Sequence, residues 1–128
     1  MRRKDRDVEN YCLDKLYAIP YNTVMKQIIY YTTTDNKCPY LDWYNSLDKS
    51  LRLIVDKRLS KVERGLYGDN KRLLETLYEL KFNNGLRIYY TEIDNIIVLL
   101  FTGGNKSKQS KDIELAKKYL NDYNERQS

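Results

Sequence analysis

The spacing of apolar residues along the chain predicts a combination of helices and strands. Apolar residues recur at helical spacing from Leu51 to Leu66 and from Ile113 to Tyr123, and Pro39 begins a shorter helix before them. Alternating or continuous apolar runs predict strands at residues 26–33, 77–82, 86–91 and 96–101. This order predicts an α+β fold: a small antiparallel sheet of about four strands, with two helices after the first strand and a C-terminal helix.

Turn residues separate the predicted strands. Asn83-Asn84-Gly85 is expected to join two strands as a hairpin, because Asn and Gly accept positive φ, and Asp94-Asn95 is expected to make the next turn. Gly103-Gly104-Asn105-Lys106 is expected to break the last strand. Ser107 or Ser110 is then expected to cap the C-terminal helix.

The length of 128 residues suits one domain with a modest core. Strong signals begin at Met25, so residues 25–128 are predicted to form that domain. Residues 1–24 differ, because charges of both signs mix there with a weak helical stripe that Pro20 ends. This segment is predicted to be a peripheral N-terminal extension in which a helix could form.

The absence of histidine limits the chemistry that the chain can perform. Catalysis by Ser-His-Asp or Cys-His groups is excluded, so Asp, Glu, Lys, Arg or Tyr must act instead. Cys12 and Cys38 are only two soft ligands and lie far apart, so neither a metal site nor a cofactor is expected. Two lone cysteines do not form a disulfide framework, so a reduced, cytoplasmic protein is expected. No apolar run approaches the roughly 20 residues of a membrane span, so no membrane partner is expected.

The net charge of +5 favours a polyanionic partner such as nucleic acid, or an acidic protein. Strand alternation places Glu79, Lys81, Arg87 and Tyr89 side by side on the face expected to point away from the core. Lys106 follows the Gly-Gly pair near a helix N-terminus, where backbone amides also attract anions. These residues predict a phosphate site, although a solvated cross-strand charge cluster also explains the strand residues and stays open.

Two stretches of the chain resemble a known protein family. The sequence LYELKFNNGLRIYY at Leu77–Tyr90 is similar to the family's hairpin, in which E-L-R and Y-R-V-Y-Y/F flank a short turn. Leu99–Ala116 is similar to the family's strand-to-helix segment, G-G-D/N-K-x-x-Q-x-x-D-I-x-x-A, and the segments 39–47 and 65–71 also fit. From about Met25 onward, the chain therefore resembles the RelE/ParE superfamily of toxins, in its HigB-like addiction module killer branch.

The resemblance implies a toxin of a type II toxin–antitoxin system that inhibits translation by cutting mRNA in the ribosomal A site. Its implied partners are a cognate helix-turn-helix antitoxin, the ribosome and mRNA. Two alternatives stay open: a non-catalytic ParE-like inhibitor of DNA gyrase on the same fold, and a phage accessory nucleic-acid-binding protein. Residues 1–24 precede the usual family start; a misassigned start, a lineage-specific arm and an antitoxin-contacting segment all stay open.

A metal-independent endoribonuclease must activate a 2′-hydroxyl, stabilise charge on the phosphate and protonate the leaving 5′-oxygen. Arg87 is expected to stabilise the phosphate, while Lys81 and Lys106 bind the backbone and one of them transfers a proton. Glu79 is expected to act as a base or to orient Lys81 or Arg87. The other expected site residues are the RNA contacts Lys71, Tyr89, Lys108 and Lys111, and the structural residues Gln109, Asp112, Gly103 and Gly104.

Overall fold

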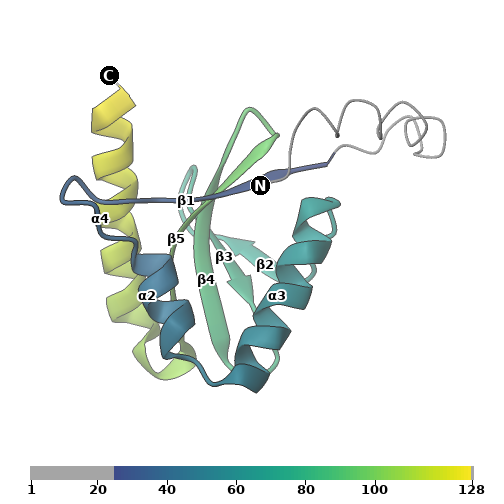
Figure 1. Cartoon of the computed structure of the whole chain (residues 1–128). Coiled ribbons are helices and arrows are strands. Elements are labelled where there is room, and N and C mark those ends of the chain that lie inside the picture. The colour runs from purple at the N-terminus through teal and green to yellow at the C-terminus, as the bar shows by residue number, and fades with distance from the viewer. Residues whose placement is uncertain (1–24, 128) are drawn as a thin grey trace, which may run out of the picture.

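The computed structural model describes residues 25–127, in which helices cover both faces of a five-stranded sheet (Figure 1). The strand order is β1-β5-β4-β3-β2, and neighbouring strands are antiparallel except for β1 and β5, which are parallel. In chain order the elements are β1 (Gln27–Tyr30), α2 (Pro39–Ser46), α3 (Lys49–Glu63), β2 (Asn70–Arg72), β3 (Tyr78–Lys81), β4 (Leu86–Ile93), β5 (Ile97–Asn105), the 3-10 turn η1 (Lys106–Lys108) and α4 (Gln109–Gln127).

Capping and turn residues set the boundaries of several elements. Pro39 lies in the first turn of α2, where its fixed φ suits a helix start. The Asp48 side chain accepts a hydrogen bond from a backbone N–H in the first turn of α3. The predicted turns are confirmed: Gly85 has a φ of 95° in the β3–β4 hairpin, and Asp94 and Asn95 have φ values of 55° and 60° between β4 and β5.

Each face of the sheet carries its own hydrophobic core. On one face, α2 and α3 supply residues such as Val55, which packs in a core with Ile88. On the other, Leu120 of α4 packs in a core with Tyr89 and Phe101. We call these the α3 face and the α4 face. A sheet that is buried on both faces leaves few positions at which a polar strand residue can reach solvent.

The predicted α+β class and the C-terminal helix are confirmed, but the predicted sheet was wrong in two respects. It has five strands rather than about four, and β1 pairs with β5 in parallel. The additional strand, β2, consists of three exposed residues within the expected loop, too few to show alternation. The pairing partner of β1 lies far along the chain, where no local pattern reveals it. The predicted extension at residues 1–24 lies outside the described residues.

The start of the C-terminal helix also differs from the prediction. Asn105, rather than Ser107 or Ser110, caps the turn η1, because its side chain accepts a hydrogen bond from the Ser107 N–H at 3.1 Å. The Ser107 hydroxyl donates to the same Asn105 oxygen at 2.6 Å. Strand β5 therefore passes directly into η1 and α4 without an intervening loop.

An irregularity in the β4–β5 pairing determines which β5 residues face each helix. Tyr89 lies opposite Thr102, whereas Tyr90 lies opposite Leu100, so Phe101 is an extra residue in β5. One extra residue reverses the faces of all residues that follow it, because side chains alternate along a strand. In the part of β5 that follows Phe101, each side chain therefore lies on the opposite face from the one that uninterrupted alternation along the strand would give.

Candidate functional site

The strand register brings most of the expected strand residues together. Glu79 lies opposite Tyr89, and Lys81 lies opposite Arg87. Lys71 of the edge strand β2 lies opposite Glu79. The prediction that the side chains of Glu79, Lys81, Arg87 and Tyr89 share one face is confirmed, since directly opposed residues point the same way. They lie on the α4 face.

The α4 face is not open to solvent at this point. Glu79 and Tyr89 are fully buried, and Arg87 is 7% exposed. The expectation that this face points away from the core was wrong, because α4 packs on it and builds a second core there. A solvated charge cluster is excluded for Glu79 and Arg87 for the same reason, whereas Lys81 is half-buried.

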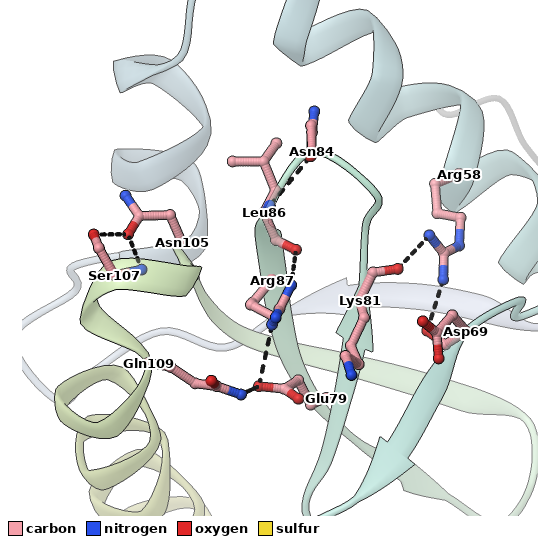
Figure 2. Close-up of polar contacts among 10 residues, drawn as sticks. All are labelled: Arg58, Asp69, Glu79, Lys81, Asn84, Leu86, Arg87, Asn105, Ser107 and Gln109. Carbon is pink, nitrogen blue, oxygen red and sulfur yellow. Dashed lines mark hydrogen bonds and ion pairs between the residues drawn. The ribbon is translucent and has the colours of Figure 1, made fainter.

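An ion pair and a hydrogen bond hold the Arg87 guanidinium inside the protein (Figure 2). Arg87 Nε lies 3.6 Å from Glu79 Oε2, and Arg87 Nη1 donates to the Leu86 carbonyl at 3.2 Å. Gln109 Nε2, at the start of α4, donates to the same Glu79 oxygen at 2.7 Å. Gln109, expected to be structural, therefore supports Arg87 through Glu79.

Buried polar atoms without a hydrogen-bond partner concentrate around this ion pair. In the part of the chain that the structure describes, these side-chain atoms are Glu79 Oε1, Arg87 Nε, the Tyr89 hydroxyl and Asp112 Oδ2. Burial, followed by the nearby Glu79, raises the pKa of Tyr89 and keeps its hydroxyl protonated. We call Glu79, Arg87, Tyr89, Gln109 and Asp112 the buried polar cluster. Buried polar groups are normally paired, so this concentration is typical of a functional site.

Close packing requires Gly103 and Gly104. Their expected role in breaking the strand was wrong, because β5 continues through both residues. A Cβ on Gly103 would lie 2.2 Å from the Trp43 ring of α2, and one on Gly104 would lie 1.9 Å from Asp112 Oδ2 of α4. The two glycines therefore allow two helices to approach β5 from opposite faces.

Asp112→Asn is expected to stabilise the protein at neutral pH. Burial raises the pKa of Asp112, although Lys108 and Lys111 oppose the shift. The folded state therefore favours the protonated carboxyl, and the native residue loses stability as pH rises from its ordinary pKa of 3.8 through the folded-state pKa. Melting temperatures of both proteins, measured from about pH 3 to about pH 7, test this dependence.

The advantage of Asp112→Asn should disappear below about pH 3.8, where the native carboxyl is protonated in both states. Asp122→Asn is the matched control on the same helix. A hydrogen bond from Tyr31 lowers the pKa of Asp122, so this control should lose stability at neutral pH. An Asp112→Asn effect that does not change with pH would show that the carboxylate charge is not its cause.

Three lysines surround the start of α4. Lys106 and Lys108 lie in η1, Lys111 lies in the first turn of α4, and all three are exposed. With the residues between them they line an open surface hollow of about 390 Å³. Backbone N–H groups at a helix start favour anions, so these lysines add charge where an anion is already favoured.

The sequence analysis missed Arg58. This residue occupies a core-facing position of the α3 stripe, between Ile54 and Val62, and donates hydrogen bonds to three backbone carbonyls. A charged residue at an apolar position of a helical stripe is the signal that could have identified it.

The chemistry of the buried polar cluster is that of carboxyl groups and a guanidinium. Within residues 25–127, no group of three or more Cys, His, Asp or Glu residues is placed to hold a metal ion. None of the described helices is long and apolar enough to cross a membrane.

The described residues define an α+β protein with a five-stranded mixed sheet and a C-terminal helix. No protein-family model matches the chain. An uncharacterized protein of Haemophilus influenzae is 34% identical to it over 79 residues, which are 59% of this chain and 79% of that protein. The chain belongs to the same family as this Haemophilus influenzae protein.

Proposed function

We propose that this chain is the toxin of a type II toxin–antitoxin system, in the HigB-like branch of the RelE/ParE superfamily, and that it cuts mRNA on the ribosome. The observation that supports this most is the direct opposition of Lys81 and Arg87 on β3 and β4. Like charges directly opposite each other destabilise a sheet. Glu79 already pairs with Arg87, so Lys81 is the cation of this opposed pair that remains for a bound anion.

Further cations lie close to this pair. Arg87 lies opposite Gly104, and Lys106 directly follows β5, so the chain returns to the same end of the sheet. The Cβ of Lys106 is 3.8 Å from the position that a Cβ on Gly85 would take, at the β3–β4 hairpin. Clustered cations bind nucleic acid through its phosphate backbone, with an affinity that falls as the salt concentration rises.

The roles of the individual residues follow from their burial. Lys81 and Lys106 remain accessible, so in the proposed reaction they bind the phosphate. The 2′-oxygen bonds to phosphorus and gives up its proton to solvent water, while the P–O5′ bond breaks and one of the two ammonium groups protonates the leaving 5′-oxygen. Glu79 is fully buried beside Arg87, which favours orienting Arg87 over acting as a base. Tyr89 is also fully buried, so the expected contact between Tyr89 and RNA does not fit this structure.

The proposed function also implies partners, a place of action and further contacts to the RNA. The partners would be translating ribosomes, their mRNA and a helix-turn-helix antitoxin, and the site of action would be the cytoplasm. Lys108 and Lys111 would hold the RNA strand beyond the cleaved phosphate, because they are exposed around the hollow at the start of α4. Lys71 is exposed on β2, which β4 and β3 separate from β5, and would make a secondary contact.

Lys106→Ala is expected to slow mRNA cleavage by about tenfold to a hundredfold, because a hydrogen bond to a charged group is worth about 1.5–3 kcal/mol. The measurement is the rate at which a defined message is cut in a translating cell extract. Lys118→Ala is the matched control, because Lys118 is an exposed lysine of α4 outside the hollow.

Both variants should keep the native melting temperature, since each removes an exposed side chain. Two results would contradict a phosphate contact at Lys106. One is cleavage at the native rate by Lys106→Ala, and the other is an equal loss of cleavage rate in Lys106→Ala and Lys118→Ala.

A further inference from the structure

A cleft of about 790 Å³ opens on the α3 face, opposite the buried polar cluster. It lies between α3, the segment 66–69 and the β3–β4 hairpin. Its volume falls within the range of roughly 300–1,000 Å³ that is typical of ligand sites. Of the residues given a role in the proposed nuclease, Lys81 also lines this cleft, and the other lining residues have no role there.

Arg58 forms a fixed wall of the cleft. It donates to the carbonyls of Tyr67 at 2.8 Å, Lys81 at 2.7 Å and Asp69 at 2.8 Å, and Figure 2 shows two of these contacts. Its guanidinium carbon also lies 4.8 Å from the centre of the Phe82 ring. These contacts hold Arg58 without pairing it to a carboxylate, so its positive charge remains available to a ligand.

The rest of the lining combines aliphatic and cationic side chains. Ile54 and Leu66 are 44% and 59% exposed, and both line the cleft. Lys57 and Lys61 stand one turn apart on α3, a like-charge spacing that weakens a helix unless an acidic group lies near. Among the described residues, no ion pair joins either lysine to a carboxylate. The only acidic residue that lines the cleft in the described chain is Asp69.

We propose that this cleft binds an acidic segment of a partner protein, which inserts an aliphatic side chain between Ile54 and Leu66 and places carboxylates on Lys57 and Lys61. Charge complementarity calls for an anionic occupant, and the exposed aliphatic surface calls for an apolar group on it. RNA fits less well, because single-stranded RNA stacks its bases on open aromatic faces. The aromatic ring in this lining, Phe82, is 6% exposed and is covered by Arg58.

A library of random twelve-residue peptides, displayed on phage and selected on the full chain, tests this proposal. We expect the enriched peptides to carry Asp or Glu around Leu, Ile or Val. The most enriched peptide is then labelled with fluorescein, and its affinity is measured by anisotropy. Ile54→Glu and Lys61→Glu should each weaken binding by about tenfold or more, which is a loss of about 1.4 kcal/mol.

Leu53→Glu is the matched control for Ile54→Glu, because Leu53 is 51% exposed on the same helix but does not line the cleft. It should bind the peptide with native affinity. Enriched peptides that lack acidic and aliphatic residues would overturn the proposal. So would an Ile54→Glu variant that binds the labelled peptide with native affinity. Binding of a labelled twelve-nucleotide RNA that Lys61→Glu abolishes, with no peptide effect, would assign the cleft to RNA instead.

This inference does not rest on the proposed nuclease activity, because the peptide assay involves no cleavage. Ile54→Glu changes only the α3 face, so mRNA cleavage by this variant should remain native. The two proposals can therefore fail separately.

Discussion

Replacing Glu79 by Ala is expected to lower the free energy of unfolding by about 3–5 kcal/mol. The change leaves the buried Arg87 guanidinium without a countercharge, since Glu79 is the one described carboxylate within ion-pair distance of it. Gln109 also loses the oxygen to which it donates at 2.7 Å. Urea unfolding, followed by circular dichroism, measures the loss.

The double variant Glu79→Leu/Arg87→Leu separates the charge from the packing. Replacing both partners of a buried ion pair by apolar residues is often neutral, so the double variant should recover most of the loss. A loss below about 1 kcal/mol in Glu79→Ala would give this pair the strength of a surface ion pair and contradict its burial.

The burial of the ion pair between Glu79 and Arg87 also complicates any activity test on Arg87. Arg87→Ala would remove the one described ion-pair partner of Glu79, which is fully buried on the α4 face, so stability and activity would fall together. Loss of growth inhibition in that variant therefore cannot assign a catalytic role to Arg87. The exposed Lys106 gives the cleaner test, because its removal leaves no buried partner.

Gly103→Ala is expected to destabilise the protein by about 3 kcal/mol, at the upper end of the usual cost of overpacking. The added Cβ would meet three atoms of the Trp43 ring at 2.2–2.5 Å, and a fused ring cannot bend away. Gly104→Ala should cost less, because the group it meets is the carboxylate end of Asp112, which can turn aside. Urea unfolding of both variants compares the two costs.

A double-mutant cycle with Trp43→Ala tests the cause of the Gly103 effect. In the Trp43→Ala background the added methyl group has room, so Gly103→Ala should lower the free energy of unfolding only slightly further. An equal cost of Gly103→Ala with and without the Trp43 ring would contradict the packing explanation and leave the backbone of β5 as the cause.

The local features of the fold could be predicted from the sequence. The hairpin at Asn83-Asn84-Gly85 and the turn at Asp94-Asn95 depend on residues that accept positive φ, and both formed where expected. The helical stripe on α3 identified part of its core side. Val55, Leu59 and Val62 are buried, whereas Ile54 and Leu66, which belong to the same stripe, are exposed. These features are decided within a few residues, so a local pattern is enough to reveal them.

The features that the sequence did not predict depend on distant segments. The extra residue Phe101 shifts the face of Gly104, and the parallel partner of β1 lies at the other end of the domain. Most importantly, α4 covers the strand face that carries Glu79 and Arg87. Strand alternation shows that residues share a face, but it cannot show what covers that face.

The structure divides the candidate site into an inner and an outer part. The inner part is the buried polar cluster, in which Glu79 fixes Arg87. The outer part consists of accessible lysines, among them Lys81, which lies opposite Arg87, and Lys106, which lies beside the β3–β4 hairpin. In the proposed nuclease, the inner part would hold the geometry and the outer part would contact the RNA.

The most direct test of the proposed function is the mapping of new mRNA 5′ ends in cells after a short induction of the protein. The cells are compared with and without an inhibitor of translation. We expect cuts at codon positions that appear only while the message is being translated. Intact messages despite growth arrest would contradict the nuclease and would favour a ParE-like inhibitor of DNA gyrase.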